Sequence, residues 1–389
     1  MRPIPYAKQL IDTDDVQAVT DALQSDWLTQ GPAVGQFESQ LAAYCDARHG
    51  VAVNSGTAAL HISALALGLG PGKILWTSPN SFVSSANCGL FCGATIDFID
   101  IDYDTGNIDI QTLEEKLLAS EKNGSLPDVI IPVHFAGQSC DMARFGELKA
   151  RYGFSIIEDA CHALGGSYRG TPIGNCAFSD ITVFSFHAVK SLTTGEGGMA
   201  VTNSDMLCEK LRQFGSHGIT RTENHFHAES HGPWYYEQID LGYNYRMTDI
   251  QAALGSSQLR KLDVFISNRQ ILAERYVKAI QDSRLPLTPL SNDSDSLSAH
   301  HLFVVRLNER ESSLSRAQLF QKLREKNILT QVHYIPIHTQ PYYKERGFDW
   351  GDFPNAEKHY LRSLSLPLFV SLSENEQSYV IDALCQLLK

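Results

Sequence analysis

The sequence predicts an α/β fold, in which a mostly parallel sheet carries helices on both faces and a smaller α+β domain follows. Short apolar strands alternate with helices, as in Ile74–Thr77, the helix after Asn80, and the strand Ile96–Ile101. Strands that are apolar along their whole length are typical of a sheet buried on both faces. The chain has 389 residues, more than one core usually holds. We therefore expect two domains, 1–255 and 256–389.

The net charge of -12 disfavours a nucleic-acid partner, because phosphate backbones are bound by basic surfaces. The N-terminal residues contain no apolar signal core, and the longest apolar run, 58–69, is too short to cross a membrane. Cys88 and Cys92 lie one helical turn apart, but no second pair completes a zinc site. We expect a cytoplasmic protein with reduced thiols, no membrane contact and no bound metal.

The first part of the chain supplies most of the predicted sheet. A helix beginning after Asp12 should end near Leu23, and a loop at 25–32 should precede the helix Val34–Tyr44. Further strands are expected from Val51, at 129–134, at 155–159, from Thr182 and at 197–203. Further helices are expected after Thr57 and at 80–90, 109–118, 142–152 and 205–214.

After residue 215 the regular alternation of strands and helices ends. Residues 216–245 are predicted to form a loop with four histidines, which we interpret as surface or pocket-wall residues. A long helix capped by Thr248 or Asp249 should run towards Ile280, with room for breaks, and link the domains. The second domain should then contain a polar, turn-rich segment at 286–300, strands at 301–307 and 329–336, and helices at 315–326 and 374–388.

Lys190 follows the strand that begins at Thr182, where the sequence becomes polar and rich in glycine. Functional groups are often placed where a rigid strand meets a loop. A lysine at such a point is, on its own, usually a solvated charge. Its interpretation therefore depends on the residues predicted to lie at the same edge of the sheet.

Two further motifs fall at that edge. Ser55-Gly56-Thr57 joins a strand to a helix, so it is either an anion site or simply a helix start. Asp159 ends a strand and is either a helix N-cap or a functional carboxylate. Together with Lys190 they form the set that pyridoxal phosphate (PLP) requires: a phosphate cradle, a carboxylate for the pyridine nitrogen, and a lysine that forms an imine. Such a lysine must be neutral, so we expect burial to lower its pKa.

Several motifs, in order along nearly the whole chain, resemble one family. They are Asn54-Ser-Gly-Thr-Ala-Ala-Leu60, Glu158-Asp-Ala-Cys-His-Ala-Leu-Gly165, Phe184-Ser-Phe-His-Ala-Val-Lys190, Gly195-Glu-Gly-Gly198, Gly242-Tyr-Asn-Tyr-Arg-Met247 and Val332-His-Tyr-Ile-Pro336. The sequence is similar in these motifs to the DegT/DnrJ/EryC1/StrS sugar aminotransferases. The resemblance implies a fold type I PLP-dependent transferase that works as a homodimer with active sites shared across the interface.

The resemblance also implies roles for single residues. Lys190 would be the imine lysine and proton shuttle, Asp159 would pair with the pyridine nitrogen, and His162 would lie near the phenolic oxygen of the ring. The other implied cofactor contacts are the phosphate ligands Gly56, Thr57 and Ser185, the ring-stacking Phe82, and Asn244 from the partner subunit. The implied sugar-nucleotide site comprises Tyr6, Asp26, Trp27, Leu28, Thr29, His333, Tyr334, Ile335 and Pro336.

Four stretches (the segment at Tyr6, 25–31, 80–87 and 185–190) look most like family members of pseudaminic acid synthesis. This resemblance implies that the substrates are a UDP-linked 4-keto-6-deoxy amino sugar and L-glutamate, with Arg306 or Arg362 as candidates for binding the glutamate carboxylate. Amination of another nucleotide-linked 4-keto sugar, as in a bacillosamine-type route, is the alternative. Lys190 argues against the family's dehydratases, which have histidine there. The complete set of Lys190, Asp159 and Ser55-Gly56-Thr57 argues against a catalytically silent binding domain.

Overall fold

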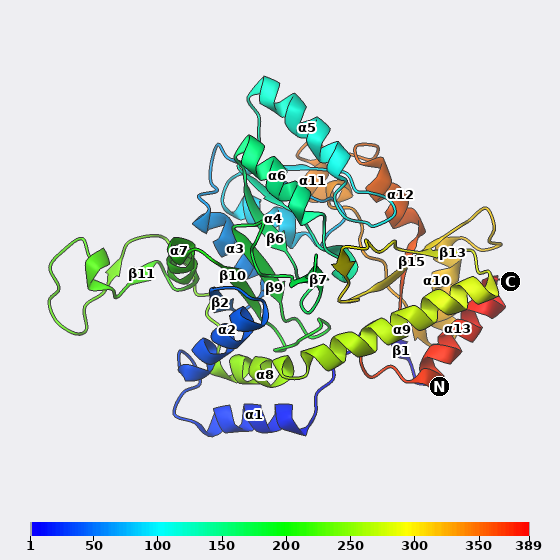
Figure 1. The fold of residues 1–389 in the computed structure, drawn as a ribbon, viewed down its shortest axis with the longest axis horizontal. Coiled ribbons are helices and arrows are strands. Elements are labelled where there is room, and N and C mark those ends of the chain that lie inside the picture. The colour runs from blue at the N-terminus through cyan, green and yellow to red at the C-terminus, as the bar shows by residue number, and fades with distance from the viewer. Residues whose placement is uncertain (1, 389) are drawn as a thin grey trace.

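The computed structural model describes residues 2–388. Among them, seven strands form one central sheet with helices on both faces (Figure 1). The strand order is β2 (His49–Val53), β10 (Gly198–Thr202), β9 (Ile181–Ser185), β6 (Ser155–Asp159), β5 (Val129–Ile131), β3 (Ile74–Thr77) and β4 (Thr95–Phe98). Strand β10 is antiparallel to both neighbours, and the other pairs are parallel. The predicted fold class is confirmed.

The strands are apolar throughout because successive side chains enter two different helix layers. Ile157 and Val183 pack in one layer, with helices α3 (Gly56–Ala66), α4 (Ser84–Phe91) and α7 (Asp205–Gly215). Ile156 and Ile130 pack in the other, with α5 (Ile110–Asn123) and α6 (Met142–Tyr152). Helices α2 (Pro32–Tyr44) and α8 (Asp249–Leu259) continue that second layer towards β2.

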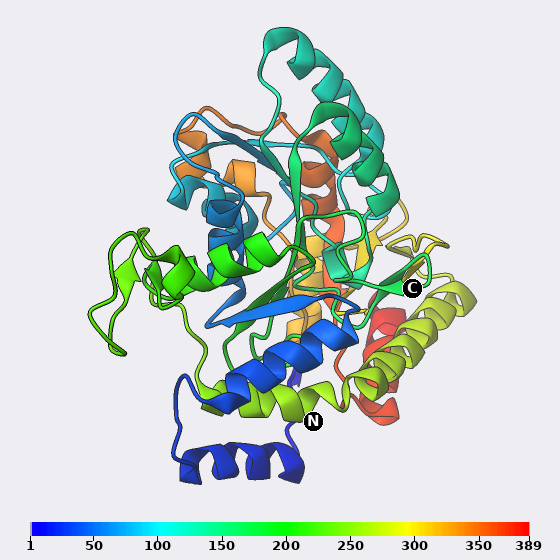
Figure 2. The same ribbon diagram turned by 60° about the vertical axis from the view of Figure 1, so that its left-hand side comes forward.

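The two helices at the base of this domain begin with capping boxes. Asp12 caps α1 (Thr13–Gln24), and Thr248, one of the two predicted caps, caps α8. Helix α1 packs along α8 (Figure 2). The predicted long helix is interrupted after Leu259 and resumes as α9 (Leu262–Ser283), which runs towards the second domain.

The second domain is built on the antiparallel sheet of β13 (Leu287–Pro289), β15 (Phe303–Leu307) and β17 (Ser363–Leu366). Its core also includes α10 (Arg316–Glu325) and α13 (Glu374–Leu388). Within α9, Ile266 packs in the first domain and Leu272 in the second. Two segments cross over, since Ile4 of β1 (Ile4–Pro5) packs in the second core and Tyr343 in the first. The division at 255/256 remains a proposal.

The strand predicted at 329–336 is wrong. Only β16 (Ile328–Leu329) is a strand, and it pairs with β1. His333 still contacts the small domain, with its Nδ1 2.7 Å from Ser365 Oγ of β17. The chain then passes to the first domain, where the Ile337 N–H donates to the Pro79 carbonyl at 2.9 Å. Elements that were not predicted include α11 (Pro341–Lys344), α12 (Pro354–Arg362), β1, β13, β17, and short pieces at β7 (Ser167–Tyr168), β8 (Thr171–Pro172), β14 (Ser296–Leu297), η1 (Phe135–Gly137) and η3 (Ile337–Thr339).

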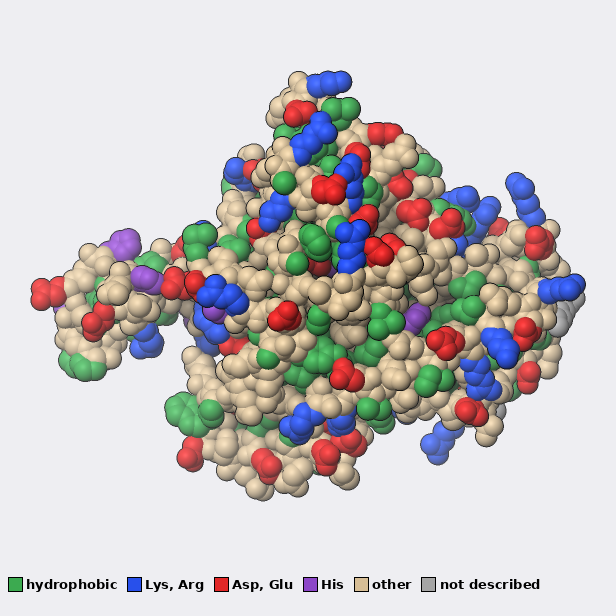
Figure 3. All heavy atoms as spheres, in the orientation of Figure 1, with side chains coloured by type: hydrophobic (Ala, Val, Ile, Leu, Met, Phe, Trp, Pro, Cys, Tyr) green, Lys and Arg blue, Asp and Glu red, His purple; other side chains and the backbone are tan. Residues whose placement is uncertain are grey.

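Residues 216–245 form an arm that projects from the first domain (Figure 1). It contains β11 (Ile219–Thr220), η2 (Glu223–His225) and β12 (Glu237–Gln238), and Figure 3 shows histidine side chains on its surface. His217, His225, His227 and His231 are all exposed. Within residues 2–388, no three His, Cys, Asp or Glu side chains gather as a potential metal-binding group. Nor is any helix in this range long and apolar enough to span a membrane.

Candidate active site

A cavity of about 640 Å³ opens where β6 and β9 end and α3 begins. This is the edge at which parallel α/β sheets bind ligands. The predicted site residues that line the cavity are Lys190, Asp159, His162, Gly56, Thr57, Phe82, Ser185, Tyr6, His333 and Tyr334. Residues as far apart in the sequence as Tyr6 and Tyr334, from both predicted domains, therefore meet in one place.

The structure does not bring the other predicted residues to this chain's cavity. Those outside its lining are Asp26, Trp27, Leu28, Thr29, Asn244, Ile335 and Pro336. The loop at 26–29 is exposed and tied to the start of α8, since the Asp249 N–H donates to the Leu28 carbonyl at 3.0 Å. Asn244 is also exposed, in keeping with its expected role at a partner's site.

No arginine lines the cavity. Arg306 is buried, but its Nη2 lies 3.0 Å from Asp104 Oδ1, and it also donates to the Tyr103 carbonyl. Arg362 is likewise absent from the lining. Neither candidate is therefore placed by this chain's fold to bind the glutamate carboxylate within its own cavity.

The N-terminus of α3 forms one wall of the cavity. Ser55 caps the helix by accepting a hydrogen bond from the Ala58 N–H at 3.1 Å. The N–H groups of Gly56 and Thr57 have no hydrogen-bond partner among residues 2–388, so they are free for an anion. A Cβ on Gly56 would lie 2.8 Å from the Cβ of Ser185, so only glycine allows this approach. These donors and the Ser185 hydroxyl can cradle a phosphate.

Asp159 occupies the end of β6, with its backbone N–H bonded to the Pro132 carbonyl at 2.9 Å. Its Oδ2 accepts from Ser85 Oγ at 2.7 Å, and its Oδ1 accepts from the Cys161 N–H at 3.2 Å. A carboxylate has about four acceptor positions, so Asp159 retains capacity for a donor in the cavity. It is thus a functional carboxylate candidate rather than a helix N-cap, which was the other interpretation.

Lys190 lies in the turn after β9, where its N–H donates to the His187 carbonyl at 2.9 Å. Burial lowers the pKa of Lys190, although the neighbouring Cys161 and Asp159 act to raise it. The predicted direction is confirmed. A lowered pKa makes more of the neutral amine available for attack on an aldehyde.

Tyrosines and histidines form the opposite wall. Tyr334 OH lies 3.1 Å from His162 Nε2, and the rings of Tyr6 and His333 are 5.4 Å apart. Burial and the charge of Lys190 hold the pKa of His162 well below its ordinary value of 6.5, and they lower that of His333 to about 3. Both imidazoles are therefore neutral hydrogen-bonding groups.

Sequence reasoning gave no site role to His301, Ser84, Cys161 or Glu196, which also line the cavity. Cys161 stands inside a quoted motif, between Asp159 and His162, so its place there could have been inferred. Burial raises its pKa well above the ordinary value, which leaves a thiol rather than a thiolate. His301 carried only a weak signal, because it was counted as the first residue of a strand.

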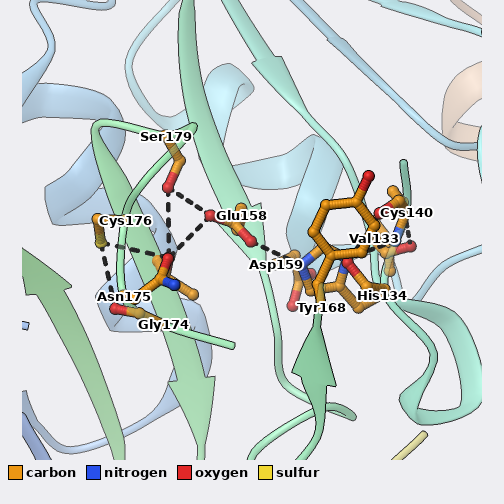
Figure 4. Close-up of polar contacts among 12 residues, drawn as sticks. Val133, His134, Cys140, Glu158, Asp159, Tyr168, Gly174, Asn175, Cys176 and Ser179 are labelled. Carbon is orange, nitrogen blue, oxygen red and sulfur yellow. Dashed lines mark hydrogen bonds and ion pairs between the residues drawn. The ribbon is translucent and has the colours of Figure 1, made fainter. Parts of the chain in front are cut away.

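The residue before Asp159, Glu158, carries a second buried carboxylate, which lies outside the cavity lining (Figure 4). Glu158 accepts hydrogen bonds from His134 Nε2 at 2.8 Å, from Thr182 Oγ1 at 3.2 Å and from Ser179. The Cys140 N–H donates to His134 Nδ1 at 3.1 Å, so Nε2 is the ring nitrogen that donates to Glu158. Burial raises the pKa of Glu158, but these donors outweigh it, and the net shift is downward.

The residues present fit PLP. The α3 N-terminus, Thr57 and Ser185 would hold its phosphate, Asp159 its pyridine nitrogen, and Lys190 its aldehyde carbon. When bound, PLP supplies a protonated ring that withdraws electrons from the reacting carbon. The fold and this set of groups define a PLP-dependent aminotransferase of fold type I.

Comparison with known proteins gives the family. The model of the DegT/DnrJ/EryC1/StrS aminotransferase family matches residues 9–385, and the chain belongs to this family of PLP-dependent sugar aminotransferases. It is 42% identical over 388 residues to the spore coat polysaccharide biosynthesis protein SpsC of Bacillus subtilis, covering 99% of this chain and 97% of that protein.

Two solved structures are similar over almost the whole chain. Helicobacter pylori PseC, an aminotransferase involved in the biosynthesis of pseudoaminic acid, is 30% identical with a TM-score of 0.90, covering 100% of this chain and 99% of that chain. A putative sugar aminotransferase from Streptococcus pneumoniae, in its PMP form, is 30% identical with a TM-score of 0.89, covering 99% and 98%. The same protein is also known in its PLP form. The predicted cofactor is confirmed.

Proposed function

We propose that this enzyme transfers the amino group of L-glutamate to C4 of UDP-2-acetamido-2,6-dideoxy-β-L-arabino-hex-4-ulose. The product would be UDP-4-amino-4,6-dideoxy-N-acetyl-β-L-altrosamine, a precursor of pseudaminic acid. The observation that carries the proposal is the similarity to PseC along the whole chain, with a TM-score of 0.90. The neutral wall of Tyr6, His333 and Tyr334 supports it, because hydroxyl and acetamido groups need hydrogen-bond partners rather than charges.

In this proposal each residue acts on a stated group. Lys190 holds the cofactor and, once released, moves a proton to or from the carbon that bears the amino group. Asp159 keeps the pyridine nitrogen protonated, and His162 contacts the phenolic oxygen. Phe82, which is 59% exposed at the cavity, covers the ring face. We also propose that Asn244 reaches the phosphate of a partner subunit in a homodimer, and that the loop at 26–29 and residues 335–336 contact the sugar nucleotide.

A second candidate is amination of another nucleotide-linked 4-keto-6-deoxy sugar, as in a bacillosamine-type route. The chain is 42% identical to SpsC and 30% identical to PseC, and SpsC is named for spore coat polysaccharide biosynthesis. This higher identity supports the second candidate. In this candidate the cofactor half of the site is unchanged, and the sugar wall receives a different epimer or nucleotide.

Mass spectrometry and NMR of the product separate the two. The enzyme is incubated with L-glutamate and either the β-L-arabino 4-keto sugar or its D-xylo epimer. We expect a 4-amino product from the L-arabino sugar, formed at least about tenfold faster, in line with the selectivity of sites that hydrogen-bond their substrates. Amination of the D-xylo epimer alone, or of neither, would overturn the substrate assignment.

A further inference from the structure

His301 presents a buried imidazole at the cavity with no partner in the chain. Its side chain is 3% exposed, lines the cavity, and lies 4.5 Å from the His162 ring between centroids. Neither ring nitrogen makes a hydrogen bond within residues 2–388, and Nδ1 is fully buried. Nε2 has no partner in the described part of the chain either but is not fully enclosed, so it is the ring nitrogen that a ligand in the cavity can pair with.

The fold holds this histidine in place by unusual means. Arg269 is 1% exposed, and its Nη1 donates to the carbonyl oxygens of His300, His301 and Leu368 at 3.2 to 3.3 Å. Burial lowers the pKa of Arg269 to about 10. A cation bonded only to carbonyls is costly to bury. Its contacts fix the backbone on both sides of the His301 peptide.

The turn at residues 136–137 holds the same segment from the other side. The Ala299 N–H donates to the Gly137 carbonyl at 3.0 Å, and the Leu302 N–H donates to the Ala136 carbonyl at 3.3 Å. A Cβ on Gly137 would lie 2.7 Å from the His300 nitrogen, so only glycine permits this approach. His300 itself has a left-handed φ of 45°. The backbone is therefore fixed tightly where His301 enters the cavity.

The chemistry of His301 indicates what it binds. Burial, together with the nearby positive charges of Lys190 and Arg269, holds the pKa of His301 well below 6.5, so the ring is neutral. A neutral imidazole offers one N–H donor and one acceptor, which suits a hydroxyl or an amide. Glutamate, by contrast, brings two carboxylates, and the cavity lining has no arginine and only one lysine, Lys190.

We propose that His301 is a specificity-determining residue that hydrogen-bonds a hydroxyl or acetamido group of the acceptor sugar, and not the glutamate donor. This inference rests on the proposed function, since it assumes that a nucleotide sugar enters the cavity. It adds His301 to the neutral wall of Tyr6, His333, Tyr334 and His162. It predicts that loss of the imidazole affects only one of the two half-reactions.

The test uses His301→Phe, which keeps an aromatic ring of similar size without its nitrogens, and His301→Gln, which keeps one donor and one acceptor. Single-turnover absorbance follows conversion of the PLP form by L-glutamate and of the PMP form by the 4-keto sugar. We expect His301→Phe to slow the sugar half-reaction about 10- to 100-fold, the usual effect of leaving a polar group unpaired. The glutamate half-reaction should stay within about threefold, and His301→Gln should recover part of the sugar rate.

A binding measurement and a matched control complete the test. Calorimetry with the 4-amino sugar product should show an affinity about tenfold lower in His301→Phe. His300→Asn changes the neighbouring side chain, which lies outside this cavity, and asparagine tolerates its left-handed backbone. We expect both of its half-reactions to match the wild type.

Equal loss of both half-reactions in His301→Phe and His301→Gln would overturn the proposal, because His301 would then act on the cofactor or the fold. An unchanged sugar half-reaction would also overturn it. If the wild type aminates a different nucleotide 4-keto sugar, the same comparison is made with that sugar. Failure of the substrate assignment is therefore distinct from failure of the role proposed for His301.

Discussion

Two carboxylates on neighbouring residues of β6, Glu158 and Asp159, point to opposite faces of the sheet. Glu158 is enclosed by His134, Ser179 and Thr182 and lies outside the cavity lining. Asp159 has one hydroxyl and one N–H as partners and lines the cavity with Lys190. Both are buried, at 5% and 6% exposure. The difference shows that burial alone does not mark a functional acid, whereas hydrogen-bonding capacity left open towards a cavity does.

Among the cavity residues that lie with Asp159, Lys190 should have the largest effect on catalysis when it is substituted. Lys190 is the one lysine among residues 2–388 that lines the cavity, so Lys190→Ala removes the amine that would bond covalently to the cofactor aldehyde. We expect the visible absorbance of the lysine-bound cofactor to disappear and transamination to fall by about 10⁴-fold or more, as for other covalent catalytic groups. Absorbance spectra and coupled assays measure both.

The fold should survive this substitution, because Lys190 contributes no side-chain hydrogen bond to the described structure. Far-UV circular dichroism and gel filtration should therefore match the wild type. Measurable turnover by Lys190→Ala at a tenth of the wild-type rate or more would refute its role.

Asp159→Asn tests the carboxylate that faces the cavity. Asparagine keeps the size of the side chain and can still accept a hydrogen bond from Ser85 Oγ, but it supplies no negative charge beside the pyridine nitrogen. We expect partial cofactor retention and a loss of about 10²- to 10³-fold in kcat, the usual effect of removing one preorganised electrostatic group. Steady-state rates and cofactor content per subunit measure the two effects.

The free energy of unfolding should change by less than about 1 kcal/mol in this variant, because the lost hydrogen bond from the Cys161 N–H is offset by the removal of a buried charge. Normal turnover in Asp159→Asn would mean that the open hydrogen-bonding capacity of Asp159 has no catalytic use. The conclusion that hydrogen-bonding capacity open to the cavity distinguishes the functional Asp159 from Glu158 would then be wrong.

The two halves of the site also differ in how far the sequence predicted them. Lys190 and Asp159 follow apolar strands, and Gly56 starts a helix, so local patterns placed all three at one edge of the sheet. His301 lies in an irregular segment whose path depends on Arg269 and Gly137, and no local pattern encodes contacts between residues so far apart. Tyr334 was named from the family resemblance, but its segment was wrongly predicted as a strand, because its hydrogen bonds reach the other domain.

The position of the loop at 26–29 relative to the cavity could not be predicted from the sequence alone either. Its residues were predicted to line the sugar site, yet in a single chain they are exposed and away from the cavity. Missed elements such as α12 and β17 have polar or mixed sequences whose structure follows from packing in the second domain. Local strand and helix signals thus placed Lys190, Asp159 and the turn at 55–57, while the other cofactor contacts came from the family resemblance and the substrate half needed tertiary structure or a partner subunit.

Glu158→Gln tests the enclosed carboxylate and should have the smallest effect on catalysis. The new amide oxygen can still accept from His134 Nε2–H, but its NH2 group then meets the hydroxyls of Ser179 and Thr182, which donate to Glu158 in the wild type and would have to turn round. Losing the charge-assisted hydrogen bonds of the carboxylate should cost about 1 to 3 kcal/mol in the free energy of unfolding. Urea unfolding of the apo-protein measures this cost, and kcat should stay within about tenfold of the wild type because the variant leaves every cavity residue in place.

The effect of pH gives the same variant a second readout. The pKa of Glu158 is lowered in the folded protein from its ordinary value of 4.5, so its ionised form stabilises the fold above that pH. As pH falls below 4.5 through the folded pKa, wild-type Glu158 takes up a proton and this stabilisation is lost. The difference in unfolding free energy between wild type and Glu158→Gln should therefore be largest at neutral pH and shrink in acid. A difference that is independent of pH, or a variant that loses its cofactor without losing stability, would show that Glu158 acts on the site and not only on the sheet behind it.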